Sequence, residues 1–260
     1  MKTKIYQVDA FAEQVFSGNP AAVCPLGSWL PDEMMQHIAA ENNLAETAFF
    51  VPLGDDFHIR WFTPAVEVDL CGHATLAAAH VLFEHEQYAR KQIRFQSRSG
   101  WLEVSKTAGG LTLDFPADEL QQLTPDPAMN KAIGAVPLEI WKGKTDYMLV
   151  FENQEQVEKL LPDFRLLAKS GGRGIIVTAP GRDCDFVSRF FAPQAGIDED
   201  PVTGSAHTSL TPYWAVRLKK NPLRAMQVSR RGGKLLCSMN AGRVLIEGKA
   251  ITYLKGTITT

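Results

Sequence analysis

The chain repeats itself at a spacing of about half its length. Three short matches share one offset of 132 residues: Gly72-His73-Ala74 with Gly204-Ser205-Ala206, Ser97-Arg98-Ser99-Gly100 with Ser229-Arg230-Arg231-Gly232, and Leu113 with Leu245. A fourth match, between Phe62-Thr63-Pro64 and Phe191-Ala192-Pro193, has an offset of 129, so the second copy carries three more residues before its glycine. Solenoid repeats run to roughly 20–50 residues. This longer period therefore indicates a duplicated domain.

The division between the two copies is expected in a polar stretch with three prolines, Pro116–Pro127. We predict an N-terminal domain over residues 1–118, with the C-terminal strand 250–260 as a candidate to complete it, and a C-terminal domain over residues 119–260. Ligands favour the interfaces of such paired domains. The sequence therefore predicts a ligand cleft between two similar halves.

Short runs rich in Val, Ile and Phe, bounded by Gly, Pro and Asp, predict many strands. One segment differs, because His73–Glu86 is apolar on almost every side of its first three helical turns. A helix of that kind is surrounded by protein. The predicted fold class is α+β, with two similar β-barrel-like halves, each wrapped around a central helix and related by a pseudo-two-fold axis.

Composition excludes several classes of protein. The 27 basic and 29 acidic residues are interspersed, giving a formal net charge of −2 and no basic patch for nucleic acid. No apolar run approaches the ~20 residues of a membrane span, and the N-terminus has no signal-peptide pattern. The four cysteines are too widely spaced for a zinc knuckle or a redox pair, and Gly171-Gly172-Arg173-Gly174 is no dinucleotide fingerprint. We expect a cytoplasmic protein with reduced thiols, no metal and no cofactor.

Each copy contains a strand-like segment, a glycine and then the buried helix. The glycines are Gly72 and Gly204. A helix N-terminus presents unpaired N–H groups and partial positive charge, and glycine lets a ligand approach them closely. Two such ends could bind a substrate carboxylate or stabilise an enolate. A single copy would more simply be a core helix that begins at glycine, but two copies at matching positions favour a binding role.

Polar residues surround these glycines and open one apolar strand. His73 and Ser205 occupy equivalent positions, and Asp200 lies four residues before Gly204. An acidic residue before a helix is often only a cap or a turn former. Glu46 begins an apolar strand that follows a helix, where a partly desolvated carboxylate suits acid/base work. The second copy has no obvious counterpart of Glu46, so the predicted chemistry is asymmetric and uses a single base.

Two other groups of residues carry weaker signals. Cys71 precedes Gly72 and could act as a base, but its repeat partner is Thr203, which disfavours a two-thiol racemase. We favour Cys71 as a small buried residue. The remaining histidines that we considered are most simply core or surface residues: His80, His85 and His207.

Four motifs together resemble the PhzF-like (phenazine biosynthesis isomerase) family over nearly the whole chain. They are Asp9-Ala10-Phe11 with Gly18-Asn19-Pro20-Ala21-Ala22-Val23, Asn43-Leu44-Ala45-Glu46-Thr47-Ala48-Phe49, Cys71-Gly72-His73-Ala74-Thr75-Leu76-Ala77, and Asp200-Pro201-Val202-Thr203-Gly204-Ser205-Ala206. Val202 departs from the alanine that is usual there. The resemblance implies the diaminopimelate-epimerase-like fold.

The resemblance also implies roles for particular residues. Glu46 would move a proton between two carbons, and His73, Asp200 and Ser205 would line the site and assist. Substrate would be bound by Asn19, Gly72 and Gly204. The partners implied are a small carboxylate substrate and a second copy of the chain in a homodimer.

Three functions are therefore open at this point. The first is a cofactor-independent isomerase with Glu46 as the acid/base. The second is an amino-acid racemase or epimerase that uses Cys71 as a base. The third is a small-anion-binding or interaction protein that keeps the fold without turnover. Fold alone does not choose among them.

Overall fold

The computed structural model describes residues 2–260 and divides them into two compact units. The first unit combines the residues up to Asp114 with Ile246–Thr260, and the second is Phe115–Leu245. The chain changes unit within the strands Leu111–Pro116 and Arg243–Gly248. The proline-rich segment therefore lies wholly in the second unit, close to the position that the sequence predicted for the boundary.

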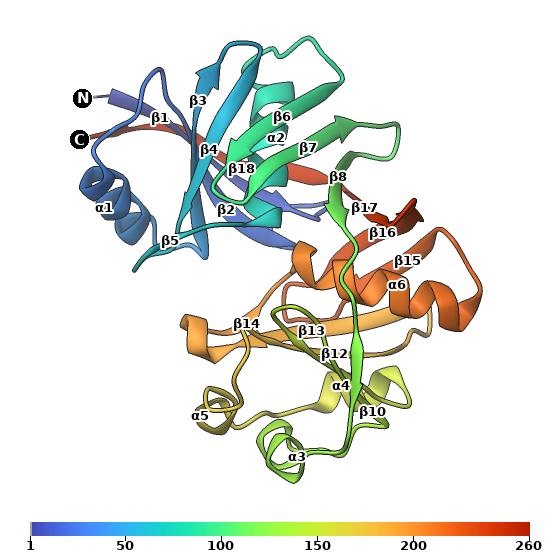
Figure 1. Ribbon diagram of the computed structural model, residues 1–260. Helices are drawn as coiled ribbons and strands as arrows, with labels where there is room; N and C mark the ends of the chain where they lie inside the picture. Colours follow the sequence, from blue (N-terminus) through green and yellow to red (C-terminus); the bar gives the residue numbers. More distant parts are fainter. Residues whose placement is uncertain (1) are drawn as a thin grey trace. The chain divides into compact units, whose positions relative to one another are not determined.

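The first unit is a curved mixed sheet with two helices. Its strand order is β18-β1-β2-β3-β4-β6-β7-β8, in which β2–β3 and β4–β6 are parallel and the other pairs are antiparallel. The elements are β1 (Lys2–Ala10), β2 (Asn19–Pro25), α1 (Asp32–Asn42), β3 (Glu46–Leu53), β4 (Asp56–Phe62), β5 (Glu67–Val68), α2 (Gly72–Glu84), β6 (Gln92–Ser97), β7 (Gly100–Lys106), β8 (Leu111–Pro116) and β18 (Ala250–Thr259). The two chain ends lie side by side, because β1 pairs with β18 (Figure 1).

Helix α2 forms the centre of the first unit. It lies behind β6 and β7 in Figure 1 and contacts β1, β2, β3, β7 and β18. Ten of its residues are buried, so the apolar character that the sequence shows on every side of this segment is matched by packing on every side. The prediction of a buried central helix is confirmed for this unit.

The second unit repeats this pattern of pairing. From β10 to β16 its pairs run antiparallel, parallel, antiparallel, parallel, antiparallel, as they do from β1 to β7 in the first unit. The elements are β9 (Gln121–Leu123), α3 (Pro127–Ile133), β10 (Glu139–Lys142), β11 (Tyr147–Val150), α4 (Gln154–Lys159), α5 (Phe164–Leu167), β12 (Ile175–Pro180), β13 (Phe186–Ala192), η1 (Pro193–Ala195), β14 (Ile197–Asp200), η2 (Gly204–Ala206), α6 (His207–Leu218), β15 (Leu223–Gln227), β16 (Gly233–Asn240) and β17 (Arg243–Gly248). The duplication inferred from the sequence is thus also present in the topology.

Helix α6 is less regular than α2, because it contains Pro212. Proline has no N–H, so the carbonyl four residues earlier, at Thr208, lacks its helical donor. The backbone N–H of Asp118 donates to that carbonyl at 3.1 Å, and Ser209 donates its hydroxyl to the Asp118 carboxylate at 2.8 Å. The segment before β9 therefore completes the hydrogen bonding of this helix.

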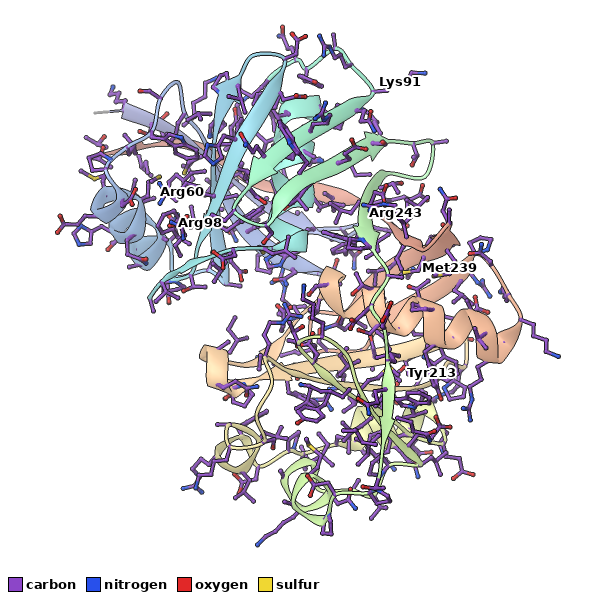
Figure 2. The ribbon with its side chains drawn as sticks, in the orientation of Figure 1. Arg60, Lys91, Arg98, Tyr213, Met239 and Arg243 are labelled. Atoms are coloured by element: carbon purple, nitrogen blue, oxygen red, sulfur yellow. The ribbon has the colours of Figure 1, made fainter. Side chains whose placement is uncertain are left out.

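A cluster of charged side chains fixes the short strand β5 beside β4. Arg60 donates two hydrogen bonds of 2.7 Å to the Glu67 carboxylate, and Arg98 approaches the same carboxylate at 2.6 Å. Arg60 and Arg98 lie near one another in Figure 2. These ion pairs of Glu67 therefore hold in place the start of the segment that leads from β5 to Gly72.

Within residues 2–260, no helix is both long and apolar enough to cross a membrane.

Candidate active site

A buried acid–imidazole pair occupies the first unit. Glu46 is the first residue of β3, which pairs in parallel with β2 beside α2. Its Oε2 atom lies 3.1 Å from Nε2 of His73, and the two side chains are only 13% and 5% exposed. The contact is close but not aligned as a hydrogen bond, so both atoms keep hydrogen-bonding capacity. Sequence reasoning predicted both residues, and the structure brings them together.

The other ring nitrogen of His73 faces two more buried groups. The Asn19 amide nitrogen lies 3.1 Å from Nδ1, and the Cys71 sulfur lies 3.5 Å from it. Asn19 is held in place by the turn before it. A Cβ on Gly18 would stand 2.2 Å from the Ala10 carbonyl oxygen, and the φ of +67° at Gly18 favours glycine.

The surroundings of His73 favour a hydrogen on Nε2. Burial of the ring opposes its charged form, but the negative charge of the Glu46 carboxylate stabilises the imidazolium and holds the pKa of His73 above 6.5. In a neutral ring that accepts from Asn19 at Nδ1, the hydrogen is likewise on Nε2. In either protonation state an N–H therefore faces the Glu46 carboxylate.

Cys71 is a thiol at neutral pH. Burial, together with the charge of Glu46, raises its pKa to about 11, although His73 and the N–H of Ala74 act in the opposite direction. The prediction of a small buried residue is confirmed by its 6% exposure. Cys71, His73 and Glu46 also offer ligand atoms within 4.8 Å of one another, a donor set that zinc accepts once the thiol has ionised.

A second polar cluster lies in the second unit around the turn that follows β14. The hydroxyl of Thr203 donates to the Asp200 carboxylate at 2.5 Å. Gln227 binds both sides of the turn, accepting from the Thr203 N–H at 2.8 Å and donating to the Asp200 carbonyl at 2.7 Å. All three side chains are buried. Asp200 is therefore part of a turn held by side-chain hydrogen bonds, as well as a candidate site residue.

Ser205 contacts an arginine that the sequence did not single out for function. Nη2 of Arg173 donates to the Ser205 hydroxyl oxygen at 2.9 Å. Arg173 also forms a bidentate ion pair with Asp146, whose side chain is 4% exposed. The glycine-rich stretch 171–174, which is not a nucleotide-binding motif, thus places the positive charge of Arg173 beside Ser205.

The predicted anion-binding glycines begin the helical segments of their units. Gly72 is the first residue of α2, and Gly204 is the first residue of the 3₁₀ turn that leads into α6. Both are buried. The N–H groups of these first turns have no partner within their own helix, as at any helix start.

Similarity to known proteins decides the family. The family model for phenazine biosynthesis-like protein matches residues 8–256. The chain belongs to this PhzF family. It is 52% identical over 259 residues to an uncharacterized isomerase of Pseudomonas aeruginosa, covering 99% of both chains. A PhzF-family crystal structure from Enterococcus faecalis matches with a TM-score of 0.97 and 48% identity over the full length of both chains.

The fold extends beyond the close relatives of the PhzF family. A predicted epimerase of Pseudomonas aeruginosa matches with a TM-score of 0.77 at 21% identity, over 99% of each chain, and shows the shared fold alone. The α+β epimerase-like fold class and the family resemblance are therefore confirmed. Membership places the chain among isomerases.

The structure also shows what sequence reasoning missed in this PhzF-family chain. Arg173 is one residue before Gly174, and the strand pairing makes Gly174 the counterpart of Glu46. Thr47 pairs with Phe62, and Ile175 pairs with Phe191, whose match to Phe62 is visible in the sequence. Strand alignment of the two copies would therefore have pointed to Arg173. Gln227, the last residue of β15, had no comparable signal.

The sequence predicted that His80, His85 and His207 are core or surface residues, and the structure buries His207 in the core and leaves the other two partly buried. His207 is fully buried, donates from Nδ1 to the Thr203 carbonyl at 2.9 Å, and has a pKa lowered to about 4 by burial. His80 and His85 share the Thr252 hydroxyl, at 2.9 and 2.7 Å.

Proposed function

We propose that the chain is a cofactor-independent isomerase that moves a proton within a small carboxylate-bearing metabolite. One observation supports this most directly: the Glu46 carboxylate is almost buried and lies 3.1 Å from His73. A carboxylate in such a place is a suitable proton acceptor and donor, because little water competes for it.

The proposed reaction has two proton transfers. Glu46 removes a proton from a carbon of the substrate, and the electron pair of the broken C–H bond is delocalised as an enolate or dienolate. The same carboxyl group then returns the proton to another carbon, which forms the new C–H bond. Nothing enters or leaves, so substrate and product are isomers.

The remaining residues are assigned supporting roles in the same reaction. The Nε2–H of His73 faces the carboxylate and can orient it or hold a proton during transfer. We propose that Asp200 and Ser205 bind substrate and assist proton movement. Asn19 positions His73. The first-turn N–H groups at Gly72 and Gly204 are proposed to hold the anionic part of the substrate.

The test is proton exchange in deuterated buffer, followed by NMR. The wild-type protein and Glu46→Gln are incubated with amino acids, 2-oxo acids and dihydrohydroxyanthranilate-type carboxylates. We expect wild type to incorporate deuterium into at least one compound, and Glu46→Gln to lose at least ~10²-fold in rate, the lower range for acid/base catalysis. Glutamine keeps the size and polarity of the side chain, so folding is expected to be unchanged.

A matched control separates loss of the base from loss of a surface charge. Glu33 is an exposed glutamate in the first turn of α1, and Glu33→Gln should exchange at the wild-type rate. If Glu46→Gln exchanged as fast as wild type, the proposed mechanism would be wrong. A bound carboxylate that stays unexchanged in every sample would instead favour the binding-protein alternative.

The racemase alternative receives less support from the geometry. Its base would be Cys71, but this thiol is buried and its pKa is raised to about 11. A thiol of that kind is a poor base and nucleophile near neutral pH.

We further propose that the protein is a homodimer in the cytoplasm. All four cysteines are free thiols, which fits a reducing compartment. Light scattering of the purified protein tests the dimer, and a monomeric mass at micromolar concentration would contradict it.

A further inference from the structure

The loop Gly171–Gly174 is built to hold one arginine in a defined place. Gly171 and Gly172 have φ values of +75° and +74°, a region that favours glycine. The N–H of Arg173 donates to the Thr145 carbonyl at 2.8 Å, and the Gly174 carbonyl accepts from the Tyr147 N–H at 3.0 Å. The backbone on both sides of the side chain is therefore fixed.

The guanidinium of Arg173 is fixed as firmly as its backbone. Nε and Nη2 donate to the two carboxylate oxygens of Asp146, at 3.0 and 2.5 Å. The guanidinium carbon also lies 5.4 Å from the centre of the Phe190 ring. A bidentate pair with a buried carboxylate, together with an aromatic face, sets the plane of an arginine. This degree of order is more than a surface ion pair needs.

The guanidinium of Arg173 also contacts Ser205 and sets the direction of its hydroxyl hydrogen. Because arginine only donates, Ser205 Oγ must accept the 2.9 Å hydrogen bond from Nη2. The hydroxyl hydrogen of Ser205 is then directed away from Arg173. Hydrogen bonds in a chain polarise one another, so a hydroxyl that accepts from a cation is a stronger donor.

Comparison of the two copies of the internal repeat also supports a functional role for this contact. His73 and Ser205 are equivalent residues, and each meets a charged side chain that lies at, or two residues before, the start of the equivalent strand. That side chain is Glu46 in the first unit and Arg173, adjacent to the counterpart of Glu46, in the second. The two copies thus place opposite charges beside equivalent positions.

We propose that Asp146, Arg173 and Ser205 form an anion-recognition site, in which Arg173 is a positioning residue that makes the Ser205 hydroxyl a fixed donor to the carboxylate of the substrate. The inference rests on the proposed function and specifies how the substrate is selected. The site favours a carboxylate over the uncharged amide of the same shape. The Arg173 side chain is 40% exposed, so it is accessible to solvent.

The test measures binding, so that it is separate from proton transfer. Anthranilate, benzoate, succinate and alanine, and the neutral amides anthranilamide and benzamide, are titrated into wild type and Glu46→Gln by calorimetry at low salt. We expect at least one carboxylate to bind to both proteins, and to bind more tightly than its amide. Because Glu46→Gln lacks the base, binding that survives in it tests this site even if the proposed mechanism fails.

Variants then assign the binding to the proposed residues. Arg173→Met should weaken carboxylate binding by at least tenfold and leave amide binding unchanged, whereas Arg173→Lys, which keeps the charge, should weaken it less. Arg173→Met combined with Ser205→Ala should bind no more weakly than the worse single variant, because arginine acts through the serine. Asp146→Asn, which keeps the shape of its side chain, should give an intermediate loss.

Thermal unfolding of each variant separates recognition from folding. If Arg173→Met does not fold, Arg173→Lys and Asp146→Asn supply the comparison. Unchanged carboxylate affinity in the folded variants, equal losses for carboxylate and amide, or additive effects of the arginine and serine substitutions would each overturn the inference. So would the absence of saturable binding of every carboxylate to wild type.

Discussion

The two copies of the glycine motif share a backbone design but differ in charge. In the first unit, the residue after the glycine is His73, and its partner is the acid Glu46. In the second, the residue after the glycine is Ser205, and its partner is the positively charged Arg173. The same scaffold therefore presents an acid–imidazole pair in one copy and an arginine–serine pair in the other.

The shared design extends to the carbonyl that precedes each glycine. Thr75 donates its hydroxyl to the Cys71 carbonyl at 2.6 Å, and His207, 132 residues later, faces the Thr203 carbonyl at 2.9 Å. Two different side chains thus satisfy the same carbonyl. Conserved geometry with changed chemistry indicates that this turn is structural, whereas the position after the glycine is free to specialise.

The copies also differ in what they can accommodate at the Glu46 position. Its counterpart is Gly174, where an added Cβ would stand 2.2 Å from the Phe190 ring. A second glutamate could not be placed there without moving that ring, which lies against Arg173. The asymmetry between the units is therefore built into their packing.

The largest expected effect comes from removing the imidazole of the first copy. His73→Asn should lower the proton-exchange rate by about 10²–10⁴-fold, the usual range for a positioned acid/base group. The matched control is His207→Asn, which removes a buried histidine from the second copy and should keep most of the activity at pH 7. Similar losses in both variants would mean that the two copies share the proton-transfer role.

The packing difference can be measured at Gly174. Gly174→Ala should lower the free energy of unfolding by about 1–3 kcal/mol, because the added methyl meets the Phe190 ring. Gly171→Ala is the control, since its Cβ would meet nothing within 4 Å and only the left-handed backbone would cost about 1–2 kcal/mol. Chemical denaturation with and without Phe190→Leu tests the cause: the loss at Gly174 should shrink in the Phe190→Leu background, and an undiminished loss would exclude the ring.

The buried histidines should make stability depend on pH in opposite directions. The pKa of His207 is about 4 when folded and near 6.5 when unfolded, so its contribution to stability is complete above pH 6.5 and is lost as pH falls toward 4. At pH 5 this loss is about 2 kcal/mol. Urea unfolding of wild type and His207→Asn at pH 7 and pH 5 measures it. The variant should lose less stability on acidification, and an equal loss would contradict the assignment.

The contribution of His73 to stability should depend on pH in the opposite direction. Its folded pKa lies well above 6.5, so its contribution to stability is present below pH 6.5 and is lost as pH rises through the folded pKa. The stability deficit of His73→Asn relative to wild type should therefore be greater at pH 6 than at pH 9. The same denaturation series checks this, and a deficit that grows with pH would show that His73 is neutral in the folded protein.

The smallest expected effect on the proton-exchange rate comes from Cys71, which precedes the glycine in the first copy where the second copy has Thr203. Cys71→Ala should change the proton-exchange rate by less than about tenfold, because the buried thiol has a pKa near 11 and Asn19 still contacts the ring. Alkylation of wild type at pH 7 should likewise be slow. A large loss of exchange on either treatment would favour the racemase mechanism.

Much of the fold and most of the candidate site were predictable from local patterns. Periodicity in the sequence predicted the duplication and the buried central helix. Short motifs predicted the residues Glu46 and His73. Arg173 and Asp146 did not, because their meaning depends on pairing between strands that lie far apart in the chain. Gln227 was missed for the same reason, since a polar residue at the end of a strand shows no partner until the strand is placed.

The amino-acid sequence alone determined the two-copy architecture, the helix that each copy encloses, and the family to which the chain belongs. These properties follow from the spacing of motifs and from the pattern of hydrophobic residues, which can be read without knowing the tertiary structure. Only the tertiary structure decided that Glu46 meets His73, that Cys71 stays a thiol, and that Arg173 holds Ser205. Those outcomes depend on burial and on distances of a few ångströms, which exist only after the strands have been brought into register.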